Sequence, residues 1–498
     1  MIPILSTTQV RAADAFTIEN EPISSLNLME RASRAFVKKF NTLSSGGKEI
    51  NIFCGTGNNG GDGLVIARVL AQQAHVVNVF VVGNLEKASP DFKANYERLG
   101  PLTVPVLIHS TEDIPIIKKQ SIVIDGLFGS GLSRPVEGLF AKVIQKINAS
   151  ESEVFSIDIP SGLFGDKPNT DGSIIKSNHT ITFQTPNLGF CLPENQEKVG
   201  EWHIVDIGLD REFIDKQETA YYFTEQKDIV IPFRNKFDHK GSAGRMLLVA
   251  GSKGKMGAAI LSARAAIRAG CGLLFVHTPC CGLNVLQVSV PEAMVVEDEH
   301  TEVVSEVLPE DNIDVVVIGP GIGTGSLTSK ALSDLILQAQ APMVLDADAI
   351  NILSENSSLI EALPAESVLT PHPGEFKRLV GDWKNGFEKL DLLRNFCVKH
   401  QLNMVLKGAY SAVCNVKGEV YFNPSGNPGM ATGGSGDVLT GIVGALIAQK
   451  ISPGEALKTA VFLHGLSGDL AAEQKGHIGL IASDLIEFLP KALMKISK

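Results

Sequence analysis

The segment from Asn427 to Asp437 has the residue types of a phosphate site with an acid beside it. It reads NPGMATGGSGD and is followed directly by the apolar stretch Val438 to Ala448, which predicts a helix. Three glycines allow backbone N–H groups to approach a phosphate closely, and the positive end of the helix points to the same place. Asp437 could then accept the proton of a substrate hydroxyl during in-line phosphoryl transfer. The alternative is a plain helix cap with an acidic first turn.

A second glycine-rich segment, GTGNNGGDG at Gly55 to Gly63, follows the predicted strand Ile50 to Cys54 and precedes the predicted helix Leu64 to Gln73. Strand, glycine loop and helix in this order are typical of a dinucleotide site. The segment departs from the GxGxxG fingerprint because two asparagines and an aspartate stand among the glycines. Their amide and carboxylate oxygens suit a cation or a ribose phosphate.

Two further aspartates, Asp125 and Asp158, each stand at the end of an apolar run. Functional residues of parallel sheets commonly lie at such strand ends. Ser161 follows three residues after Asp158 in the segment IDIPSG. Between the aspartates, GSGLSRP at Gly129 to Pro135 predicts a second anion loop, which carries an arginine. Asp158 is the candidate general acid or base of such a site. The alternative interpretation is that Asp158 is a helix N-cap that leads into Pro160.

The composition sets limits on the kind of protein. A chain of 498 residues predicts two domains, or three, and 44% hydrophobic residues suffice for sizeable cores. A formal net charge of −11 argues against a nucleic-acid surface. Seven cysteines without a CxxC pair indicate neither a disulfide framework nor a zinc site, so a cytoplasmic location is expected. No signal sequence and no apolar run of about 18 residues is evident, so no membrane association is expected.

The elements that would position these residues fall into two series of short β-branched runs alternating with helical patterns, which predicts two α/β domains with parallel sheets covered by helices. In the first series the predicted strands are Ile50 to Cys54, Val76 to Val82, Ile122 to Asp125 and Val154 to Ile159. The predicted helices are Ser24 to Phe40 and Leu64 to Gln73. The polar stretch from Leu209 to Asp228, which has no clear buried strand, marks the expected boundary.

The second series carries polar residues and glycines at its strand ends. Its predicted helix is Gly257 to Ala269, and its predicted strands are Arg245 to Ala250, Leu273 to His277, Val315 to Ile318, Met343 to Asp346, Val368 to Pro371 and Met404 to Leu406. The segments GPGIG, DADA and HPGE follow three of these strands, so we expect them in one crevice. GPGIG alone could be a tight turn, and HPGE alone a helix start with Glu375 near its N-terminus.

The second series, from about Phe233 to Leu489, resembles the ribokinase-like superfamily and, within it, the NAD(P)H-hydrate dehydratases. The resemblance rests on HKGSAG, GPGIG, HPGE, KGAYS and NPGMATGGSGD together. It implies that Asp437 is catalytic. It also implies ligand contacts from Ala258, Gly321, Gly323, His372, Pro373, Gly374, Glu375, the region up to Arg378, Lys407, Gly408, Ala409, Tyr410, Ser411, Asn427, Gly429, Met430, Ala431, Thr432, Gly433, Gly434, Ser435 and Gly436. A structural role for His372 stays open.

The first series, over about residues 8 to 215, resembles the NAD(P)H-hydrate epimerase domain, and the fusion of both resembles the bacterial bifunctional NAD(P)H-hydrate repair family. The expected domains are 1–220, a Rossmann-like three-layer sandwich, and 221–498, a ribokinase-like α/β domain. The resemblance implies a potassium ion held by Asn59, Asp125 and Ser161, an all-oxygen set suited to a hard cation. It implies nucleotide contacts from Asn58, Asn59, Gly60, Gly61, Asp62, Gly129, Ser130, Gly131, Leu132, Ser133, Arg134, Pro135 and Asp158.

The implied reactions explain why the two halves belong together. Water added to the dihydronicotinamide ring leaves a hydroxyl on carbon six in either configuration, giving the R and S hydrates. Phosphorylation of that hydroxyl turns it into a good leaving group, and an epimerase lets both hydrates drain through one chiral dehydratase pocket. The resemblance implies ADP as the phosphoryl donor, although the spacing alone allows ATP equally.

Nucleotide chemistry in general implies magnesium, for which no residue stands out as a dedicated ligand. The resemblance implies NADHX and NADPHX as substrates. A homo-oligomer without nucleic-acid or membrane partners is expected. Two rival hypotheses are a vitamin or sugar kinase with a regulatory N-terminal dinucleotide-binding domain, and an N-terminal domain that only binds ligands.

Overall fold

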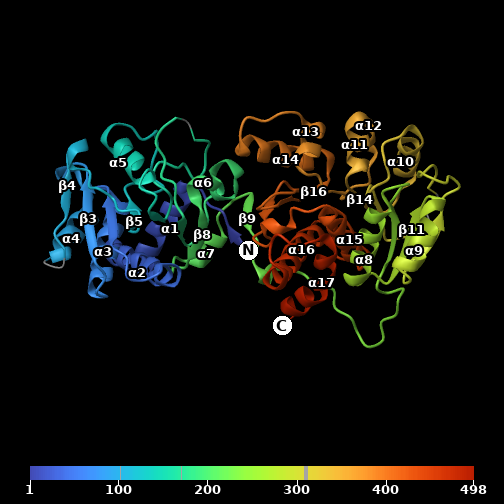
Figure 1. Ribbon diagram of the computed structural model, residues 1–498, viewed down its shortest axis with the longest axis horizontal. Helices are drawn as coiled ribbons and strands as arrows, with labels where there is room; N and C mark the ends of the chain where they lie inside the picture. Colours follow the sequence, from blue (N-terminus) through green and yellow to red (C-terminus); the bar gives the residue numbers. More distant parts are fainter. Residues whose placement is uncertain (101–102, 170, 308–311, 498) are drawn as a thin grey trace. The chain divides into compact units, whose positions relative to one another are not determined.

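The chain forms two compact units in this computed structural model, which describes residues 1–100, 103–169, 171–307 and 312–497 (Figure 1). The N-terminal unit comprises Ile2–Thr219 and Asn385–Phe387. The C-terminal unit comprises Met1, Ala220–Lys384 and Glu388–Lys498. Both units combine a largely parallel sheet with helices, so the predicted α/β class is confirmed.

The N-terminal unit contains a seven-stranded sheet with strand order β4-β3-β2-β5-β6-β7-β8. Every neighbouring pair in it is parallel. The strands are β2 (Ile50–Cys54), β3 (Val77–Val82), β4 (Val106–Ile108), β5 (Ile122–Gly126), β6 (Glu153–Ile157), β7 (His179–Phe183) and β8 (Glu201–Val205), after a two-residue strand β1 (Ile2–Pro3). The carboxyl ends of β2, β5 and β6 are therefore neighbours at one edge of the sheet.

Helices cover both faces of this sheet, because successive strand residues point to opposite sides. Ile52 belongs to the core beneath α2, α3 and α4, whereas Phe53 belongs to the core beneath α5. The helices of the unit are α1 (Thr7–Asn20), α2 (Ser25–Leu43), α3 (Asn58–Gln72), α4 (Pro90–Leu99), α5 (Gly138–Asn148), α6 (Gln196–Val199) and α7 (Arg211–Asp215). The result is a three-layer sandwich.

The sheet of the C-terminal unit runs β9-β18-β17-β16-β15-β14-β13-β10-β11-β12. It is parallel from β16 to β12, and the hairpin of β17 and β18 joins it antiparallel to β16. The strands are β9 (Tyr221–Phe223), β10 (Arg245–Val249), β11 (Leu273–Thr278), β12 (Met294–Glu297), β13 (Val315–Ile318), β14 (Met343–Leu345), β15 (Val368–Leu369), β16 (Asn403–Leu406), β17 (Ala412–Cys414) and β18 (Val420–Phe422).

One face of this sheet packs against α8, α15, α16 and α17 in a continuous apolar core. Figure 1 shows α10 to α14 on the opposite side of the sheet. The helices are α8 (Met256–Arg268), α9 (Leu283–Ser289), α10 (Ser326–Gln338), α11 (Asp348–Glu355), α12 (Ser358–Ala362), α13 (Pro373–Val380), α14 (Gly386–His400), α15 (Ser435–Ala448), α16 (Pro453–Lys475) and α17 (Ala482–Ile496). Helix α15 is almost wholly buried, which explains its uniformly apolar sequence.

The strands and helices predicted from the two series are all present, with ends shifted by a few residues. Two differences concern function. Helix α3 begins at Asn58, so the predicted glycine loop is mostly the first turns of a helix. The polar stretch between Leu209 and Asp228 contains the half-buried strand β9, which the sequence analysis missed because only three residues form it.

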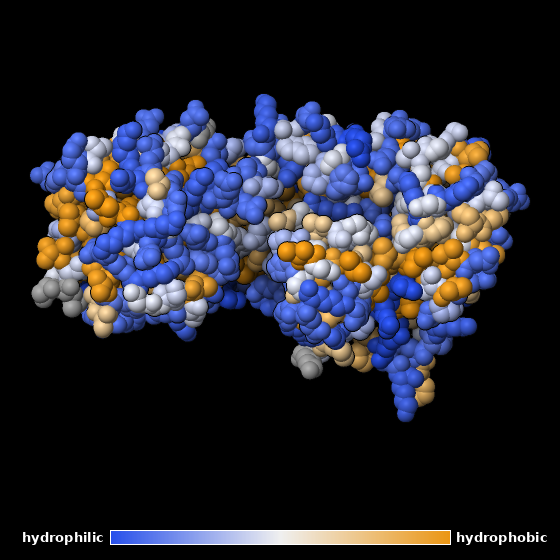
Figure 2. All heavy atoms as spheres, in the orientation of Figure 1, coloured by the Kyte–Doolittle hydropathy of each residue, from blue (hydrophilic) through white to orange (hydrophobic). Residues whose placement is uncertain are grey.

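The surface in Figure 2 is mostly hydrophilic, with smaller hydrophobic patches between the polar areas. The most exposed large apolar side chains include Phe233 and Phe237, which are 83% and 93% exposed in the segment before β10. Among the described residues, no helix combines the length and the apolar composition that a membrane crossing requires.

Candidate active sites of the two units

A cavity of about 750 Å³ opens at the carboxyl ends of β2, β5 and β6 in the N-terminal unit. Most of the residues predicted for nucleotide binding line it. They are Asn58, Asn59, Asp62, Gly129, Ser130, Gly131, Leu132, Ser133, Arg134 and Asp158. The cavity is also lined by Arg11 and Asp14 of α1, which the sequence analysis missed because no motif marks them.

The glycines after β2 are required by close packing of the start of α3 against its neighbours. A Cβ atom on Gly60 would overlap the carbonyl oxygen of Gly55, and one on Gly61 would lie 2.8 Å from the sulfur of Met29. Gly60 and Gly61 are buried beneath the cavity rather than on its wall. Their part is to let the helix carry Asn58, Asn59 and Asp62 to the cavity.

Three carboxyl groups share this cavity: Asp14, Asp62 and Asp158. Burial, followed by the charge of Asp158, raises the pKa of Asp14 to about 6. Burial also raises the pKa of Asp62 well above its ordinary value; Asp158 and Asp14 add to this, and a 3.0 Å hydrogen bond from Ser33 opposes it. Neighbouring carboxyl groups with raised pKa values can exchange protons with one another and with a substrate.

Asp158 is held in an unusual backbone conformation, with φ at +63°. Burial raises the pKa of its carboxyl group, while hydrogen bonds to Oδ1 from Thr182 at 3.1 Å and from the backbone of Phe183 at 3.3 Å lower it. A left-handed non-glycine residue costs about 1 to 3 kcal/mol and occurs preferentially where function fixes it. The surroundings hold the Asp158 carboxylate in a defined orientation. The N-cap alternative is wrong, because the described residues 159 to 169 contain no helix.

Asp125 and Ser161, two of the three residues predicted to hold potassium, are in direct contact behind the cavity. The Ser161 hydroxyl donates to Oδ1 of Asp125 at 2.6 Å, and the Ser161 backbone N–H donates to Oδ2 at 2.8 Å. The Ser161 hydroxyl also lies 3.1 Å from the carbonyl oxygen of Phe128. Asn59 packs against Gly129, and its amide nitrogen is buried and has no hydrogen-bond partner among the described residues.

These residues fit a monovalent cation. Asp125 is fully buried, burial raises its pKa, and it forms no ion pair with a lysine or arginine of the described chain. A carboxylate in such a place is stabilised by a bound cation. The hydroxyl, the carbonyl and the amide group of Asn59 supply further oxygen donors.

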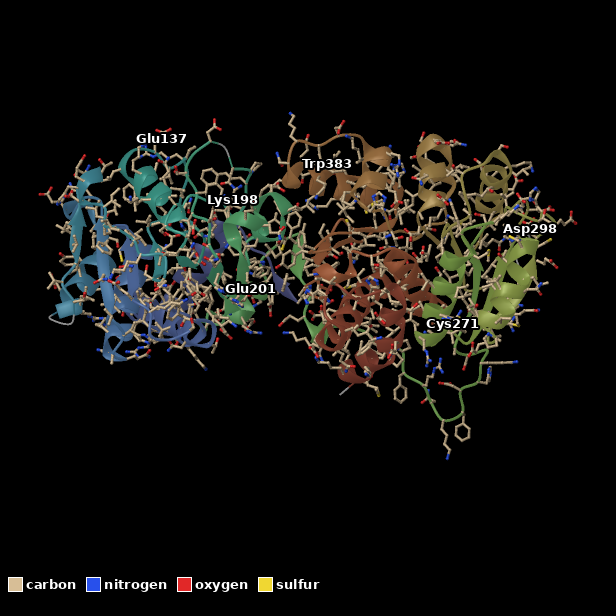
Figure 3. The ribbon with its side chains drawn as sticks, viewed as in Figure 1. Glu137, Lys198, Glu201, Cys271, Asp298 and Trp383 are labelled. Atoms are coloured by element: carbon tan, nitrogen blue, oxygen red, sulfur yellow. The ribbon has the colours of Figure 1, made fainter. Side chains whose placement is uncertain are left out.

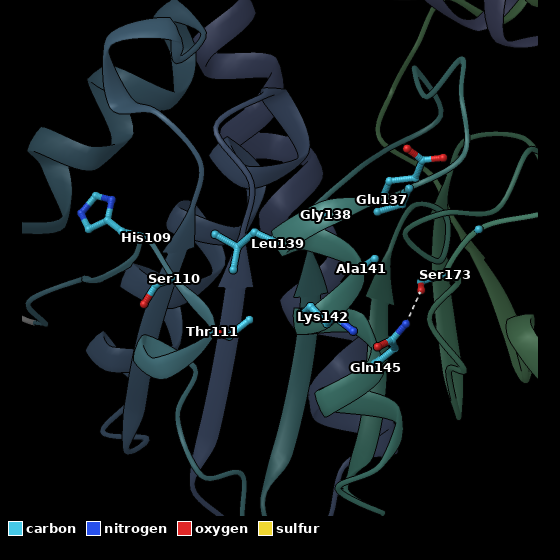
Figure 4. A pocket seen from close by; sticks show the side chains of 12 residues that line it. His109, Ser110, Thr111, Glu137, Gly138, Leu139, Ala141, Lys142, Gln145 and Ser173 are labelled. Atoms are coloured by element: carbon cyan, nitrogen blue, oxygen red, sulfur yellow. Dashed lines mark hydrogen bonds between the residues drawn. The ribbon is translucent and has the colours of Figure 1, made fainter.

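A second hollow of about 680 Å³, shown in Figure 4, lies between the loop after β4 and the start of α5. His109, Thr111 and Lys142 line it, and Gln145 donates a 3.2 Å hydrogen bond to Ser173 at its rim. None of the predicted site residues lines this hollow.

In the C-terminal unit, Asp437 stands in the first turn of α15 beside a network of charged groups. The ammonium group of Lys407, after β16, lies 2.8 Å from Oδ1 of Asp346, after β14. Thr440 donates to the other oxygen of Asp346 at 2.6 Å. Burial raises the pKa of Asp437 to about 6; Asp346 and Asp348 add to the rise, and Lys407 opposes it. An acid poised there can accept a proton near neutral pH.

The N-terminus of α15 has a glycine N-cap in place of a capping side chain. Gly434 is the N-cap with φ at +88°, a conformation that favours glycine, and no side chain caps the helix. A Cβ atom on Gly436 would lie 3.2 Å from the Lys407 ammonium nitrogen, so the amides and the cation converge. His464 of α16, whose pKa burial lowers to about 4, holds the turn through Ser435 at 2.9 Å. This arrangement has the features of an anion site with a carboxylate at its edge.

His372 and Glu375 form a capping box at the start of α13. The His372 ring nitrogen Nδ1 accepts from Gly374 at 2.9 Å and Glu375 at 3.3 Å, and Glu375 accepts from the His372 backbone at 2.9 Å. The segment HPGE therefore forms a helix start with Glu375 near the N-terminus of α13, as the structural alternative predicted. Burial, followed by Asp346, raises the pKa of Glu375, and Lys407 and His372 lower it, so the box adjoins the charged network.

The remaining predicted residues surround this network. Gly321 packs closely on Ala258, and the amide of Gly323 donates to Asp348 at 2.8 Å. The segment Lys407 to Ser411 forms a turn in which the Gly408 amide donates a 3.2 Å hydrogen bond to the Ser411 hydroxyl. Ala409 is exposed, and the ring centroid of Tyr410 lies 6.4 Å from that of Phe223. Asn427 donates to Asp469 of α16 at 2.9 Å, a partner that the sequence analysis did not identify. Gly429 and Met430 form a short 3₁₀ turn, and Ala431, Thr432 and Gly433 lead from it to α15.

Two family models match the chain. Residues 246–491 match the model described as NAD(P)H-hydrate dehydratase, and residues 25–189 match the model described as YjeF-related protein N-terminus. The chain is also similar to three proteins named bifunctional NAD(P)H-hydrate repair enzyme. The relative from Moorella thermoacetica is 34% identical over 99% of this chain and 97% of its own length. Those from Coxiella burnetii and Escherichia coli are 34% and 33% identical, over 98% and 93% of this chain and 99% and 88% of their own lengths.

A solved structure is similar to part of the chain. It is described as an ADP/ATP-dependent NAD(P)H-hydrate dehydratase from Bacillus subtilis co-crystallized with ATP/Mg2+. It is 28% identical, covers 55% of this chain and 98% of its own, and has a TM-score of 0.49.

Proposed function

The chain belongs to the family of bifunctional NAD(P)H-hydrate repair enzymes, and from that premise we propose which residues carry each of its two reactions. The enzyme epimerises hydrated NADH and NADPH and dehydrates one epimer. We assign epimerisation to residues 1–220 and dehydration of the S hydrate to residues 221–498. The single observation that carries the assignment of dehydration is the position of Asp437, an acid whose pKa is raised to about 6, at the edge of a helix N-terminus that no side chain caps in the described structure.

In the C-terminal domain, Asp437 takes the proton from the hydroxyl on carbon six as that oxygen attacks the terminal phosphorus of ADP. The bond from this phosphorus to the bridging oxygen breaks, and AMP leaves. The amides of Gly434 to Asp437 and the Lys407 ammonium group stabilise the charge on the transferring phosphoryl. The lone pair of the ring nitrogen then expels phosphate from carbon six, and loss of a proton from carbon five restores the reduced nicotinamide. The products are NAD(P)H, AMP and phosphate.

Magnesium would reach this site bound to the phosphates of the nucleotide. Both oxygens of Asp346 are already hydrogen-bonded, to Lys407 and Thr440, and Asp348 accepts from Gly323. A magnesium ion commonly keeps several waters and uses one or two carboxylates with substrate phosphates.

In the N-terminal domain, Asp158 is the acid/base residue, and Asp14 and Asp62 are its proton-sharing neighbours. Inversion at carbon six requires that the bond to the hydroxyl, or the bond to the ring nitrogen, break and re-form. One proton is added and one removed in either route, which suits neighbouring carboxyl groups whose pKa values are raised by burial. The loop Gly129 to Pro135, with Arg134, would hold the phosphates of the hydrated nucleotide.

A potassium ion would be held by Asn59, Asp125 and Ser161 with the carbonyl of Phe128. When bound it supplies the positive charge that the buried Asp125 otherwise lacks. Asp125 and Ser161 then fix the loop that follows β5, because Ser161 accepts a hydrogen bond from the Phe128 amide at 2.8 Å. We further propose a cytoplasmic, homo-oligomeric enzyme.

The proposal is tested by incubating the protein with a mixture of both NADH hydrate epimers and ADP or ATP, while reduced-nicotinamide absorbance, phosphate and nucleotide products are followed. Full recovery with stoichiometric phosphate and AMP is expected with ADP. Asp158→Asn should recover only the S fraction, since asparagine keeps the backbone conformation and loses the acid. If this variant recovers both epimers faster than the epimers interconvert unaided, the assignment of Asp158 as the acid/base residue is wrong. A stable phosphorylated hydrate instead of free phosphate would indicate a kinase.

Potassium dependence is tested separately on epimerisation. Replacement of potassium by tetramethylammonium should slow epimerisation and leave the dehydration of the pure S hydrate unchanged. Ser161→Ala should raise the potassium concentration needed for half-maximal activity. An unchanged potassium requirement in this variant would show that Ser161 does not bind the ion.

A further inference from the structure

Three side chains with metal-ligating atoms gather on the outer strands of the N-terminal sheet, away from the residues assigned to epimerisation. His179 is the first residue of β7 and pairs with Glu201, the first residue of β8. His203 follows two residues after Glu201 and pairs with Ile181. Since alternate strand residues share a face, His179, Glu201 and His203 all point to the same side of the sheet. Glu201 is labelled in Figure 3.

Their ligand atoms are close enough to share one ion. Nδ1 of His179 lies 3.8 Å from Oε2 of Glu201, and Nε2 of His203 lies 3.6 Å from Oε1. One such atom from each residue falls within a set in which no separation exceeds 4.8 Å. Bonds of about 2.0 to 2.2 Å to a tetrahedral ion separate ligand atoms by about 3.3 Å. Small side-chain adjustments would therefore close the site.

Both imidazoles present a ring nitrogen that has no partner. Nδ1 of His179 and Nε2 of His203 are buried and make no hydrogen bond in the described structure. A buried polar atom without a partner costs about 1 to 3 kcal/mol, so two of them facing one carboxylate require an explanation. A metal ion between them would satisfy both.

The surroundings orient the rings as metal ligands are usually oriented. Nε2 of His179 lies 3.9 Å from Oε1 of Glu153 of β6, where a small side-chain shift would form the carboxylate hydrogen bond that commonly orients a ligating histidine. Phe155 stacks on His179 with ring centroids 4.8 Å apart. Glu153 also binds Lys48 at 2.8 Å, which holds it in place.

One nearby charge opposes a cation, and it also prepares the ligand. Burial lowers the pKa of His203; Lys39 of α2 and His179 lower it further, and Glu201 raises it. A lowered pKa favours the neutral imidazole, which is the form that binds a metal. Glu201 faces both imidazoles directly, whereas Lys48 is paired with Glu153 at 2.8 Å.

We propose that His179, Glu201 and His203 bind a divalent transition-metal ion, zinc foremost, at the β7–β8 edge of the N-terminal sheet. Two imidazoles and one carboxylate suit zinc and exclude magnesium, calcium and potassium as preferred ions. The fourth position is left to water. The ion differs from the proposed potassium, whose donors are all oxygens. It would tie the edge strand β8 to β7, so its expected effect is on stability.

The test uses the full-length protein without a histidine tag, stripped with a chelator and titrated with zinc chloride against a chromogenic competitor. One zinc per chain is expected. His203→Ala and Glu201→Gln should each weaken zinc binding by at least about 100-fold, and Glu153→Gln by about 10- to 100-fold. Cobalt(II) should give a visible absorption band in the parent protein that Glu201→Gln abolishes. Glu201 is 67% exposed in its side chain, so this variant keeps the fold.

Two controls separate this site from other metal-binding groups. His109→Ala removes an exposed histidine of the same unit, and Asp158→Asn removes a carboxyl from the cavity; both should bind zinc like the parent. Excess potassium should not displace the zinc. The proposal is overturned if the parent binds no stoichiometric zinc, if His203→Ala or Glu201→Gln binds zinc as tightly as the parent, or if Asp158→Asn loses it.

Discussion

The ammonium group of Lys407 lies 2.8 Å from one oxygen of Asp346, across the strand that separates them, while Thr440 donates to the other oxygen. The two residues shift the pKa of Asp437 in opposite directions, since Asp346 raises it and Lys407 lowers it. Burial is the largest cause of the raised pKa of Asp437, and two strand ends that lie 61 residues apart in sequence then adjust it in opposite directions.

The pH dependence of dehydration should move in opposite directions when the two partners are removed. Asp437 must be deprotonated to act as a base, so the rate should fall as pH drops below about 6. Lys407→Met removes a positive charge and should move this acid limb to higher pH, whereas Asp346→Asn removes a negative charge and should move it to lower pH. The measurement is kcat/KM against pH on the pure S hydrate. Shifts in the same direction would refute the assignment of Asp437 as the titrating base.

Asp437→Asn should slow dehydration by about 10² to 10⁴, the usual contribution of a positioned general base. Asparagine has nearly the same shape, so the helix start is preserved. Epimerisation by the same protein should remain at the parent rate, because the two reactions lie in different domains. Asp334→Asn, at an exposed helix position, serves as the matched control. Equal loss of both activities in Asp437→Asn would point to a shared site.

Asp14→Asn should stabilise the N-terminal unit at pH 8 and leave its stability unchanged near pH 3.5. The pKa of Asp14 is raised from 3.8 to about 6 in the folded chain. The native state therefore holds the proton more tightly, and stability falls as pH rises from about 4 to 6. A shift of this size corresponds to about 1 to 3 kcal/mol above that range.

Tryptophan fluorescence gives a readout for this unit alone. The chain has two tryptophans, Trp202 in the N-terminal unit and Trp383 in the C-terminal unit, the latter labelled in Figure 3. In a Trp383→Phe background, denaturant unfolding followed through Trp202 should show the gain of Asp14→Asn at pH 8. A gain of equal size at pH 3.5 would mean that ionisation is not its cause.

Gly60→Ala should unfold or strongly destabilise the N-terminal unit, by about 3 kcal/mol or more, because the added methyl group would overlap the Gly55 carbonyl. Gly57→Ala is the matched control. It lies three residues away, has φ at −89°, and a Cβ atom there meets no atom within 4 Å. Its effect should stay within about 0.5 kcal/mol. Similar Trp202 unfolding midpoints for both variants would contradict the packing described here.

The sequence predicted the α/β class and the strands well, because β-branched runs bounded by glycine are strong signals and the strands are buried on both faces. It predicted the start of α3 poorly. Glycines and asparagines disfavour a helix interior, yet packing of Gly60 and Gly61 against Gly55 and Met29 overrides that preference.

The candidate sites show the same division. Asp437 and Asp158 stand out in the sequence because they follow recognisable segments. Asp14 carries no local signal, since its importance comes only from the place where α1 meets the cavity. The His179, Glu201 and His203 cluster was equally hidden, because the register of two parallel strands brings it together across a gap of 22 residues.

The arrangement of strands along the chain has a consequence for synthesis. Every strand of the N-terminal sheet has been translated once Val205 is made, whereas the C-terminal sheet lacks β18 until Phe422. At about 5 to 20 residues per second, the first unit has many seconds to fold at the ribosome before its neighbour is complete. A nascent chain that stalls in between would emerge with its epimerase cavity formed and no dehydratase attached.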